Sequence, residues 1–146
     1  MNKVIVVGTD GSPRAGIAVK EAIALAKLGG ATLHVVHAVR GVTLRGEHMD
    51  PAPVVAANAA AYDEGKRICA QVATEAKRED VHAQIHNVDG DPADVLLKVS
   101  EAVSADLLVV GNRGMSGIKR FVLGSVPDKV SHHCPCSLLI VNTDAE

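Results

Sequence analysis

Aromatic side chains are almost absent from this chain of 146 residues, which has one Tyr, one Phe and no Trp. An excess of basic charge is lacking too, because 15 Lys and Arg stand against 17 Asp and Glu. Proteins that bind nucleic acid rely on basic surfaces, and those that bind single strands also stack bases on aromatic rings. The composition therefore argues against nucleic acid as a partner. It predicts a core of Ala, Val, Leu and Ile, which suits helices packed on a parallel sheet.

Long apolar runs and export signals are also missing from the sequence. No stretch approaches the 18 or more apolar residues of a membrane span. The first residues, MNKVIVVGTDG, lack the length and the small-residue cleavage site of a signal peptide. The three cysteines are an odd number, which argues against a disulfide framework. We expect a cytoplasmic protein with no membrane partner.

Short apolar runs alternate with helical patterns along the chain. They predict strands at 3–8, 32–39, 81–88, 105–111 and 137–142. They also predict four helices: one at 13–27, one that begins between residues 54 and 61 and ends near 78, one at 93–103 and one after residue 125. Residues 40–53 are predicted to be a loop. The alternation indicates one domain over residues 1–146, an α/β fold with a doubly wound parallel sheet and helices on both faces. Ligands of such sheets bind beyond the carboxyl ends of the strands.

A glycine-rich stretch, GNRGMSGIKRFVLGSV, follows the fourth predicted strand. Glycine allows a backbone to come close to a ligand, and successive N–H groups can form a nest for an anion. The following helix adds free N–H groups and the positive end of its dipole. Ser125 is expected to cap this helix in a capping box with Asp128. Phosphate binding and a plain turn both remain open on spacing alone.

Known nucleotide motifs narrow the choice. The chain has no G-x-x-x-x-G-K-[ST] and no G-x-G-x-x-G after its first strand. The glycine stretch instead fits G-x2-G-x9-G-[ST]. Together with VVGTDGS, GDPADVLL and CPCSLLIV, it closely resembles the universal stress protein family, in its ATP-binding branch. The resemblance covers essentially the whole chain outside residues 40–60.

The resemblance implies a sheet of order 3-2-1-4-5, of the adenine nucleotide alpha hydrolase type, and ATP bound between the loops after strands one and four. Thr9 and Asp10 are then near the ribose and a Mg²⁺ ion, which Asp10 would hold through water. Ala38 offers its backbone to adenine. The whole predicted nucleotide-binding set is Thr9, Asp10, Ala38, Val110, Gly111, Arg113, Gly114, Gly124, Ser125 and Val126.

Several alternatives stay open beside ATP. Pro127 has no N–H to give to a phosphate, which would suit AMP or cyclic AMP. A scaffold without nucleotide is another alternative. An adenylating ATPase of the same fold would carry S-G-G-x-D-S after strand one, where this chain has TDGSPRAG. No catalytic triad or poised base is apparent, so we predict a sensor or switch with at most slow ATP hydrolysis.

The cysteines and histidines are predicted to be structural. The segment HHCPC lacks the ligand spacing of a zinc site, so its two thiols are expected to pack, pointing in different directions. The histidines of the second and third strands, His34, His37, His82 and His86, are expected to be structural. Arg113, Lys119 and Arg120 either meet a phosphate or solvate the glycine loop.

The apolar last strand is expected at a sheet edge, where it would pair two copies into a homodimer. Its residues are Ser137, Leu138, Leu139, Ile140 and Val141.

Overall fold

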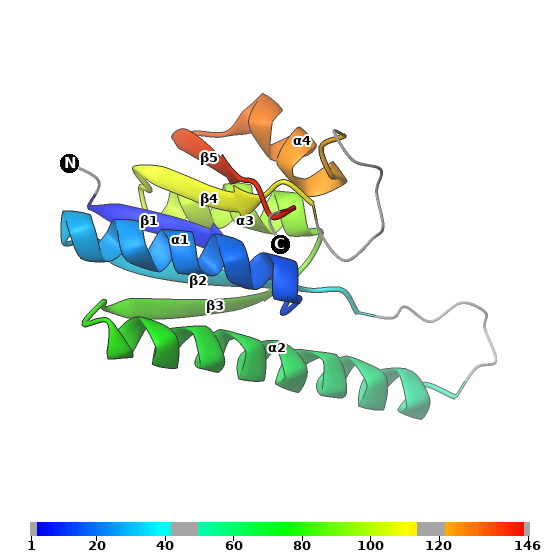
Figure 1. The fold of residues 1–146 in the computed structure, drawn as a ribbon. Helices are drawn as coiled ribbons and strands as arrows, with labels where there is room; N and C mark the ends of the chain where they lie inside the picture. The colour runs from blue at the N-terminus through cyan, green and yellow to red at the C-terminus, as the bar shows by residue number, and fades with distance from the viewer. Residues whose placement is uncertain (1–2, 42–49, 114–121, 145–146) are drawn as a thin grey trace.

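Five strands and four helices alternate in the computed structural model, which describes residues 3–41, 50–113 and 122–144 (Figure 1). The elements in chain order are β1 (Val4–Gly8), α1 (Pro13–Gly29), β2 (Thr32–Val39), α2 (Ala52–Arg78), β3 (Ala83–Asp89), α3 (Pro92–Ala102), β4 (Leu107–Gly111), α4 (Ser125–His133) and β5 (Ser137–Val141). Among the described helices, none is long and apolar enough to cross a lipid bilayer.

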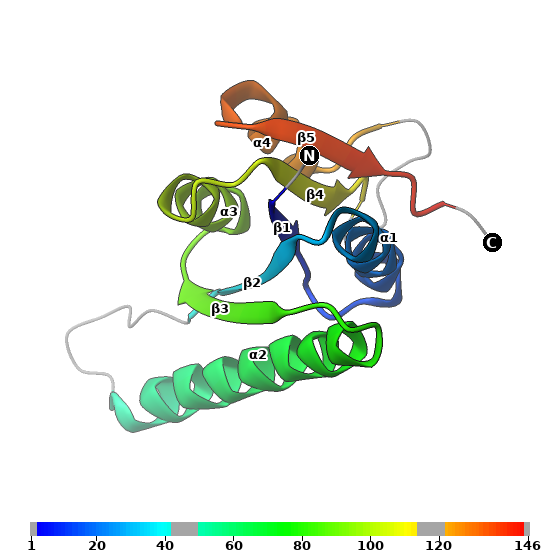
Figure 2. The ribbon, with the colours of Figure 1, turned by 90° about the vertical axis from the view of Figure 1, so that its left-hand side faces the viewer.

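The strands form one parallel sheet in the order β3-β2-β1-β4-β5, which confirms the predicted fold. Helices α1 and α2 cover one face and α3 and α4 cover the other (Figure 2). The strands at the centre are buried on both sides, so β1 reads as a continuous apolar run. Their branched side chains fill the core that aromatic rings fill in many other proteins.

The register aligns the carboxyl ends of the central strands at one end of the sheet. Gly8 lies beside Val36, and Val7 lies beside both Val35 and Val109. The chain leaves β1 toward α1 on one face and leaves β4 toward α4 on the other. The turns after β1 and β4 therefore start side by side where the winding reverses, which is where such sheets bind ligands.

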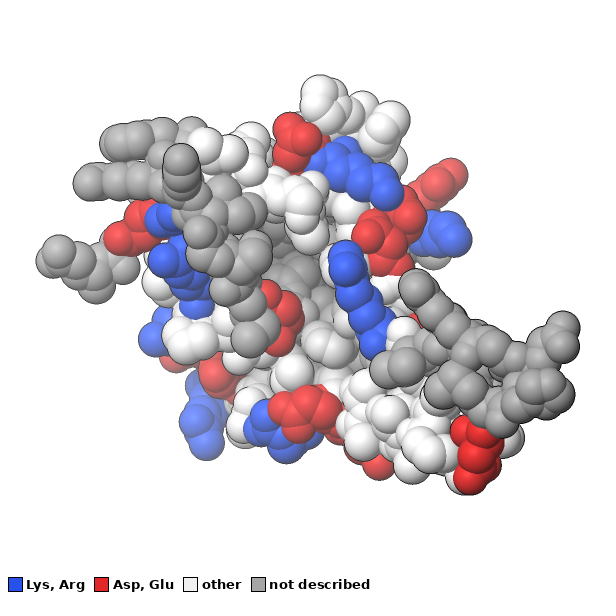
Figure 3. All heavy atoms as spheres, turned by 90° about the vertical axis from the view of Figure 1, so that its right-hand side faces the viewer, with Lys and Arg blue, Asp and Glu red and all other residues white. Residues whose placement is uncertain are grey.

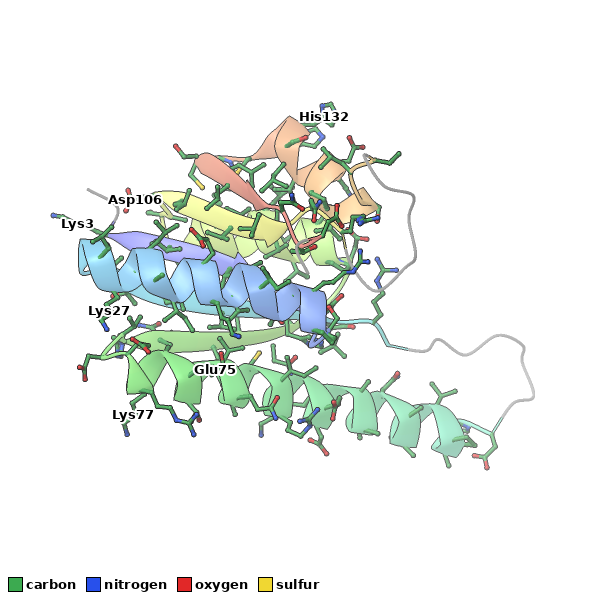
Figure 4. The ribbon with its side chains drawn as sticks, viewed as in Figure 1. Lys3, Lys27, Glu75, Lys77, Asp106 and His132 are labelled. Carbon is green, nitrogen blue, oxygen red and sulfur yellow. The ribbon has the colours of Figure 1, made fainter. Side chains whose placement is uncertain are left out.

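At the opposite end of the sheet, where the strands begin, a carboxylate joins β1 to the residue before β4. Asp106 Oδ2 accepts the backbone N–H groups of Lys3 and Val4, both at 2.9 Å. Lys3 and Asp106 lie together at this end, far from the carboxyl ends of the strands (Figure 4). This contact holds the start of β1 beside the start of β4.

The second helix starts earlier than predicted, and part of the predicted 40–53 loop is therefore wrong. Helix α2 begins at Ala52, whose N–H donates to Asp50 Oδ1 at 3.0 Å. Pro53 sits in the first turn, where a missing N–H breaks no hydrogen bond. Residues 42–49 of this predicted loop lie outside the described part of the chain.

In the sequence VHAQIHNV, apolar and polar residues alternate, which predicts an edge strand with one face toward water, and the structure of β3 confirms this prediction only in part. Its position at an edge of the sheet is confirmed. Its faces are not as predicted, because Ile85 is 45% exposed whereas His86 is half-buried. The reason is a bond to the next strand: His34 Nδ1 and His86 Nε2 are 2.8 Å apart, and His34 is buried. Burial is the main cause that lowers the pKa of both rings, because it disfavours the charged form.

Candidate functional site

A cavity of about 500 Å³ opens at the carboxyl ends of the strands. Nine of the ten predicted nucleotide-binding residues line it: Thr9, Asp10, Ala38, Val110, Gly111, Arg113, Gly124, Ser125 and Val126. The tenth, Gly114, lies outside the described residues, as do Lys119 and Arg120. Figure 3 looks onto this end of the molecule and shows a hollow at its centre, with acidic and basic side chains around it. Residues more than a hundred positions apart in the sequence are thus brought to one place.

Apolar side chains form the deep wall of the cavity. Val36 and Ala38 come from one face of β2, and Leu96 reaches in from α3. Val110 closes this wall from β4, and Pro92 lies at the start of α3. The flat face of a purine base suits a wall of this kind, since most binding pockets are lined by apolar groups with a few polar ones.

The turn after β1 supplies the polar groups nearest this wall. Thr9 N–H donates to Val36 O at 3.0 Å, which ties the turn to β2. Thr9 Oγ1 accepts the N–H of Gly11, which has a φ of +81° that favours glycine. Asp10 Oδ1 accepts the N–H of Ser12 at 2.8 Å, and Ser12 itself caps α1. Asp10 therefore shapes its own turn and also lines the cavity.

A metal ion here would need other ligands in addition to protein side chains. Over residues 3–41, 50–113 and 122–144, no group of three or more His, Cys, Asp and Glu side chains is arranged to hold a metal. Asp10 can contribute a carboxylate oxygen. The other ligands of a Mg²⁺ ion would be waters and phosphate oxygens, as is usual for this ion.

The two ends of the glycine stretch are joined by a backbone hydrogen bond. Gly124 N–H donates to Asn112 O at 2.9 Å. This bond brings the end of β4 and the start of α4 together on the cavity wall, so that Gly111 and Gly124 both line it. The residues between them, 114–121, lie outside the described part of the chain.

The start of α4 differs from the predicted capping box. Gly124, in an extended conformation, is the N-cap, and Ser125 is already the first helical residue. The Asp128 N–H donates to the Gly124 carbonyl at 3.1 Å, so it is not available to a Ser125 hydroxyl cap. The N–H groups of Ser125 and Val126 remain as the free donors of a helix start, whereas Pro127 has none.

The C-terminal residues hold the start of the glycine stretch, which the sequence did not predict. Thr143, which is buried, donates from N and from Oγ1 to Asn112 Oδ1, at 2.9 and 2.7 Å. Arg113 forms an ion pair with Asp144. The Arg113 side chain is only 9% exposed, so it does not solvate the loop. A phosphate that bound to Arg113 would have to compete with Asp144.

A charged network lies at the cavity's other rim. Arg40 Nη2 is 3.2 Å from Asp91 Oδ1, and Lys129 Nζ is 3.4 Å from Asp91 Oδ2 and 2.8 Å from Asp94 Oδ1. The N–H of Asp94, then Lys129 and Arg40, lower the pKa of Asp91, which caps α3. The network joins the end of β2, α3 and α4, each of which contributes to the cavity wall.

Seven lining residues were not in the predicted set: Gly8, Ala15, Val36, Arg40, Pro92, Leu96 and Pro127. Pro127 was already expected beside the phosphates, and Val36 also had a usable signal. Val36 stands two residues before Ala38, so the period of a strand places both on one face. Leu96 had none, because its place depends on how α3 packs across the sheet.

The cysteines of HHCPC are packing residues, but the predicted divergence of their thiols is wrong. Cys134 and Cys136 are half-buried against the α3–α4 side of the core, with their Sγ atoms 3.9 Å apart. A tight turn between α4 and β5 brings both side chains to this core. Burial first, then the neighbouring Cys134, raises the pKa of Cys136 to about 11. Cys69, on α2, is fully buried in the core on the other face of the sheet.

Comparison with known proteins gives a consistent picture. The model of the universal stress protein family matches residues 1–142. A universal stress protein of Staphylococcus aureus strain USA300 is 29% identical over 97% of this chain and 85% of its own length. A universal stress protein solved in complex with cAMP is 32% identical, with a TM-score of 0.75 over 98% of this chain and 99% of its own. A universal stress protein from Archaeoglobus fulgidus, solved with dAMP, shares the fold at 23% identity, with a TM-score of 0.67 over 94% and 96% of the two chains.

Proposed function

Because the chain belongs to the universal stress protein family, we propose that it binds an adenine nucleotide in this cavity and acts as a sensor or switch in stress adaptation. The observation that carries the proposal is the convergence of nine predicted positions on one cavity. A solved relative of 32% identity holds cAMP, which supports an adenine nucleotide as the ligand. Occupancy would change the protein's shape or its partners, with no catalytic residue required.

The proposed pose follows the chemistry of the walls. Adenine lies against the apolar side, with the backbone of Ala38 at its edge, and the ribose lies beside Thr9 and Asp10. The phosphates lie at the start of α4, near Ser125 and Val126. Each charge-assisted hydrogen bond from a free N–H group there would contribute roughly 1.5–3 kcal/mol.

ATP with Mg²⁺ is the first candidate, because the glycine pattern resembles that of the ATP-binding branch. A nucleotide with one phosphate, AMP or cyclic AMP, is the second. Two features favour it: Pro127 offers no N–H at the third helical position, and Arg113 is already paired with Asp144. These features reduce the positive groups available to the second and third phosphates.

The nucleotide can be identified directly. The purified protein is denatured and any released nucleotide is identified by mass; the native protein is then titrated in a calorimeter with ATP, AMP and cyclic AMP, with and without Mg²⁺. We expect one adenine nucleotide bound per chain. Absence of heat with all three would leave a scaffold without nucleotide. Product formation from ATP and an added acyl or sulfur acceptor would indicate an adenylating enzyme instead.

We also propose a homodimer that forms through β5. This strand lies at the sheet edge, and its apolar residues Leu138–Val141 are only half-buried. Unpaired backbone groups along such an edge favour pairing with a second copy. Sedimentation at micromolar concentration should give twice the 15.1 kDa of one chain. A mass of one chain under these conditions would refute the dimer.

A further inference from the structure

The C-terminal tail, residues 142–144, is built onto the cavity wall. Thr143 is 3% exposed and makes two hydrogen bonds to Asn112 Oδ1. A side chain at Gly111 would come within 3.1 Å of Thr143 Cγ2, so the tail packs directly on the end of β4. The backbone of Asn112 in turn holds Gly124. The tail is thus part of the structure that forms the cavity.

Asp144 lies at the centre of a cluster of charges at this wall. Its carboxylate pairs with the buried guanidinium of Arg113, and its Oδ1 is 3.8 Å from Arg14 Nη1. Asn112 Nδ2 donates to Asp144 Oδ2 at 3.3 Å. The Asp144 side chain is 25% exposed, so solvent screens this pairing only in part.

Arg113 lines the cavity, so its charge acts on whatever anion binds there. A guanidinium that is already neutralised by a carboxylate attracts a phosphate less than an unpaired one does. A second anion must therefore compete with Asp144, and the competition matters more as the ligand carries more negative charge. Adenosine, which has no phosphate, is not affected.

We propose that Asp144 is a specificity-determining residue, which neutralises Arg113 and so sets the preference of the site toward nucleotides with few phosphate charges. This inference rests on the proposed function and names the charge class of its ligand. With a neutral side chain at position 144, the Arg113 guanidinium would lose one carboxylate partner and would attract the phosphates of ATP more strongly.

The test is titration of adenosine, AMP and ATP into the wild type and into Asp144→Asn, which keeps the size of the side chain. We expect the ratio of ATP affinity to adenosine affinity to rise at least about tenfold, as one added charge-assisted hydrogen bond gives. Glu75→Gln is the matched control, because it removes one exposed acidic charge on α2, away from the cavity (Figure 4). It should leave the ratio unchanged.

A second variant keeps the test valid if Asp144→Asn does not fold. Arg113→Gln combined with Asp144→Asn removes both charges together, so its ratio should stay within about threefold of the wild type. An unchanged ratio in Asp144→Asn, or a tenfold fall of the ratio in the double variant, would overturn the inference while adenosine binding upholds the proposed function. Failure of the wild type to bind any of the three ligands would overturn both.

Discussion

Replacing Ala38 by phenylalanine should abolish the binding of adenosine, AMP, cyclic AMP and ATP alike. Ala38 lies on the face of β2 that forms the apolar wall of the cavity, and it packs toward Leu96 and its neighbours on α3. A phenyl ring at this position would occupy the space proposed for adenine. We expect calorimetric affinities to fall by about 100-fold or more, equivalent to at least about 2.7 kcal/mol.

Ala38→Ser is the control for this variant. It changes the volume of the wall very little, so nucleotide affinity should stay within about threefold of the wild type. Both variants should keep the far-ultraviolet circular dichroism of the wild type. If the phenylalanine variant were folded and bound adenosine normally, the base would have to lie elsewhere.

Gly65→Ala should lower the free energy of unfolding by about 1–3 kcal/mol, although alanine is the better helix former. Gly65 faces the sheet in the middle of α2, where an added Cβ would lie 2.2 Å from Asn87 Oδ1 and 2.6 Å from His37 Nδ1. Asn87 joins three elements at this point, because it contacts His37 at 3.0 Å and donates to Tyr62 O at 2.8 Å. A methyl group would force this bridge apart.

Gly16→Ala in α1 is the matched comparison. An added Cβ at Gly16 meets no atom within 4 Å, so alanine should raise stability by about 0.5–1 kcal/mol through its helix propensity alone. Urea unfolding of both variants measures the contrast. A Gly65→Ala protein as stable as Gly16→Ala would mean that α2 does not pack on β2 and β3 this closely.

The features that the sequence predicted correctly are those that depend on local pattern. The strand predicted at 32–39 has the bounds of β2, and the helix predicted to start at residue 13 starts there as α1. The resemblance to a known family added the sheet order and most of the cavity wall. The bounds of these elements come from local sequence pattern, whereas the sheet order and the cavity wall come from the motifs of the family.

The features that it did not predict depend on contacts between distant segments. Asp144 meets Arg113, and His34 meets His86, across separations that periodicity cannot report. The predicted capping box is wrong for a similar reason. Gly124, whose N–H is bonded to Asn112 O, is the N-cap, so α4 starts one residue earlier than it would with Ser125 as the N-cap. Tertiary packing selected among local alternatives that the sequence left nearly equal.

The most direct measurement is a crystal structure of the protein soaked with AMP at saturating concentration. The proposed site predicts density for the purine against Val36 and Ala38, with the phosphate at the N–H groups of Ser125 and Val126. Density for the ligand at another surface, or an unchanged cavity in crystals whose lattice leaves it open, would contradict the proposed site.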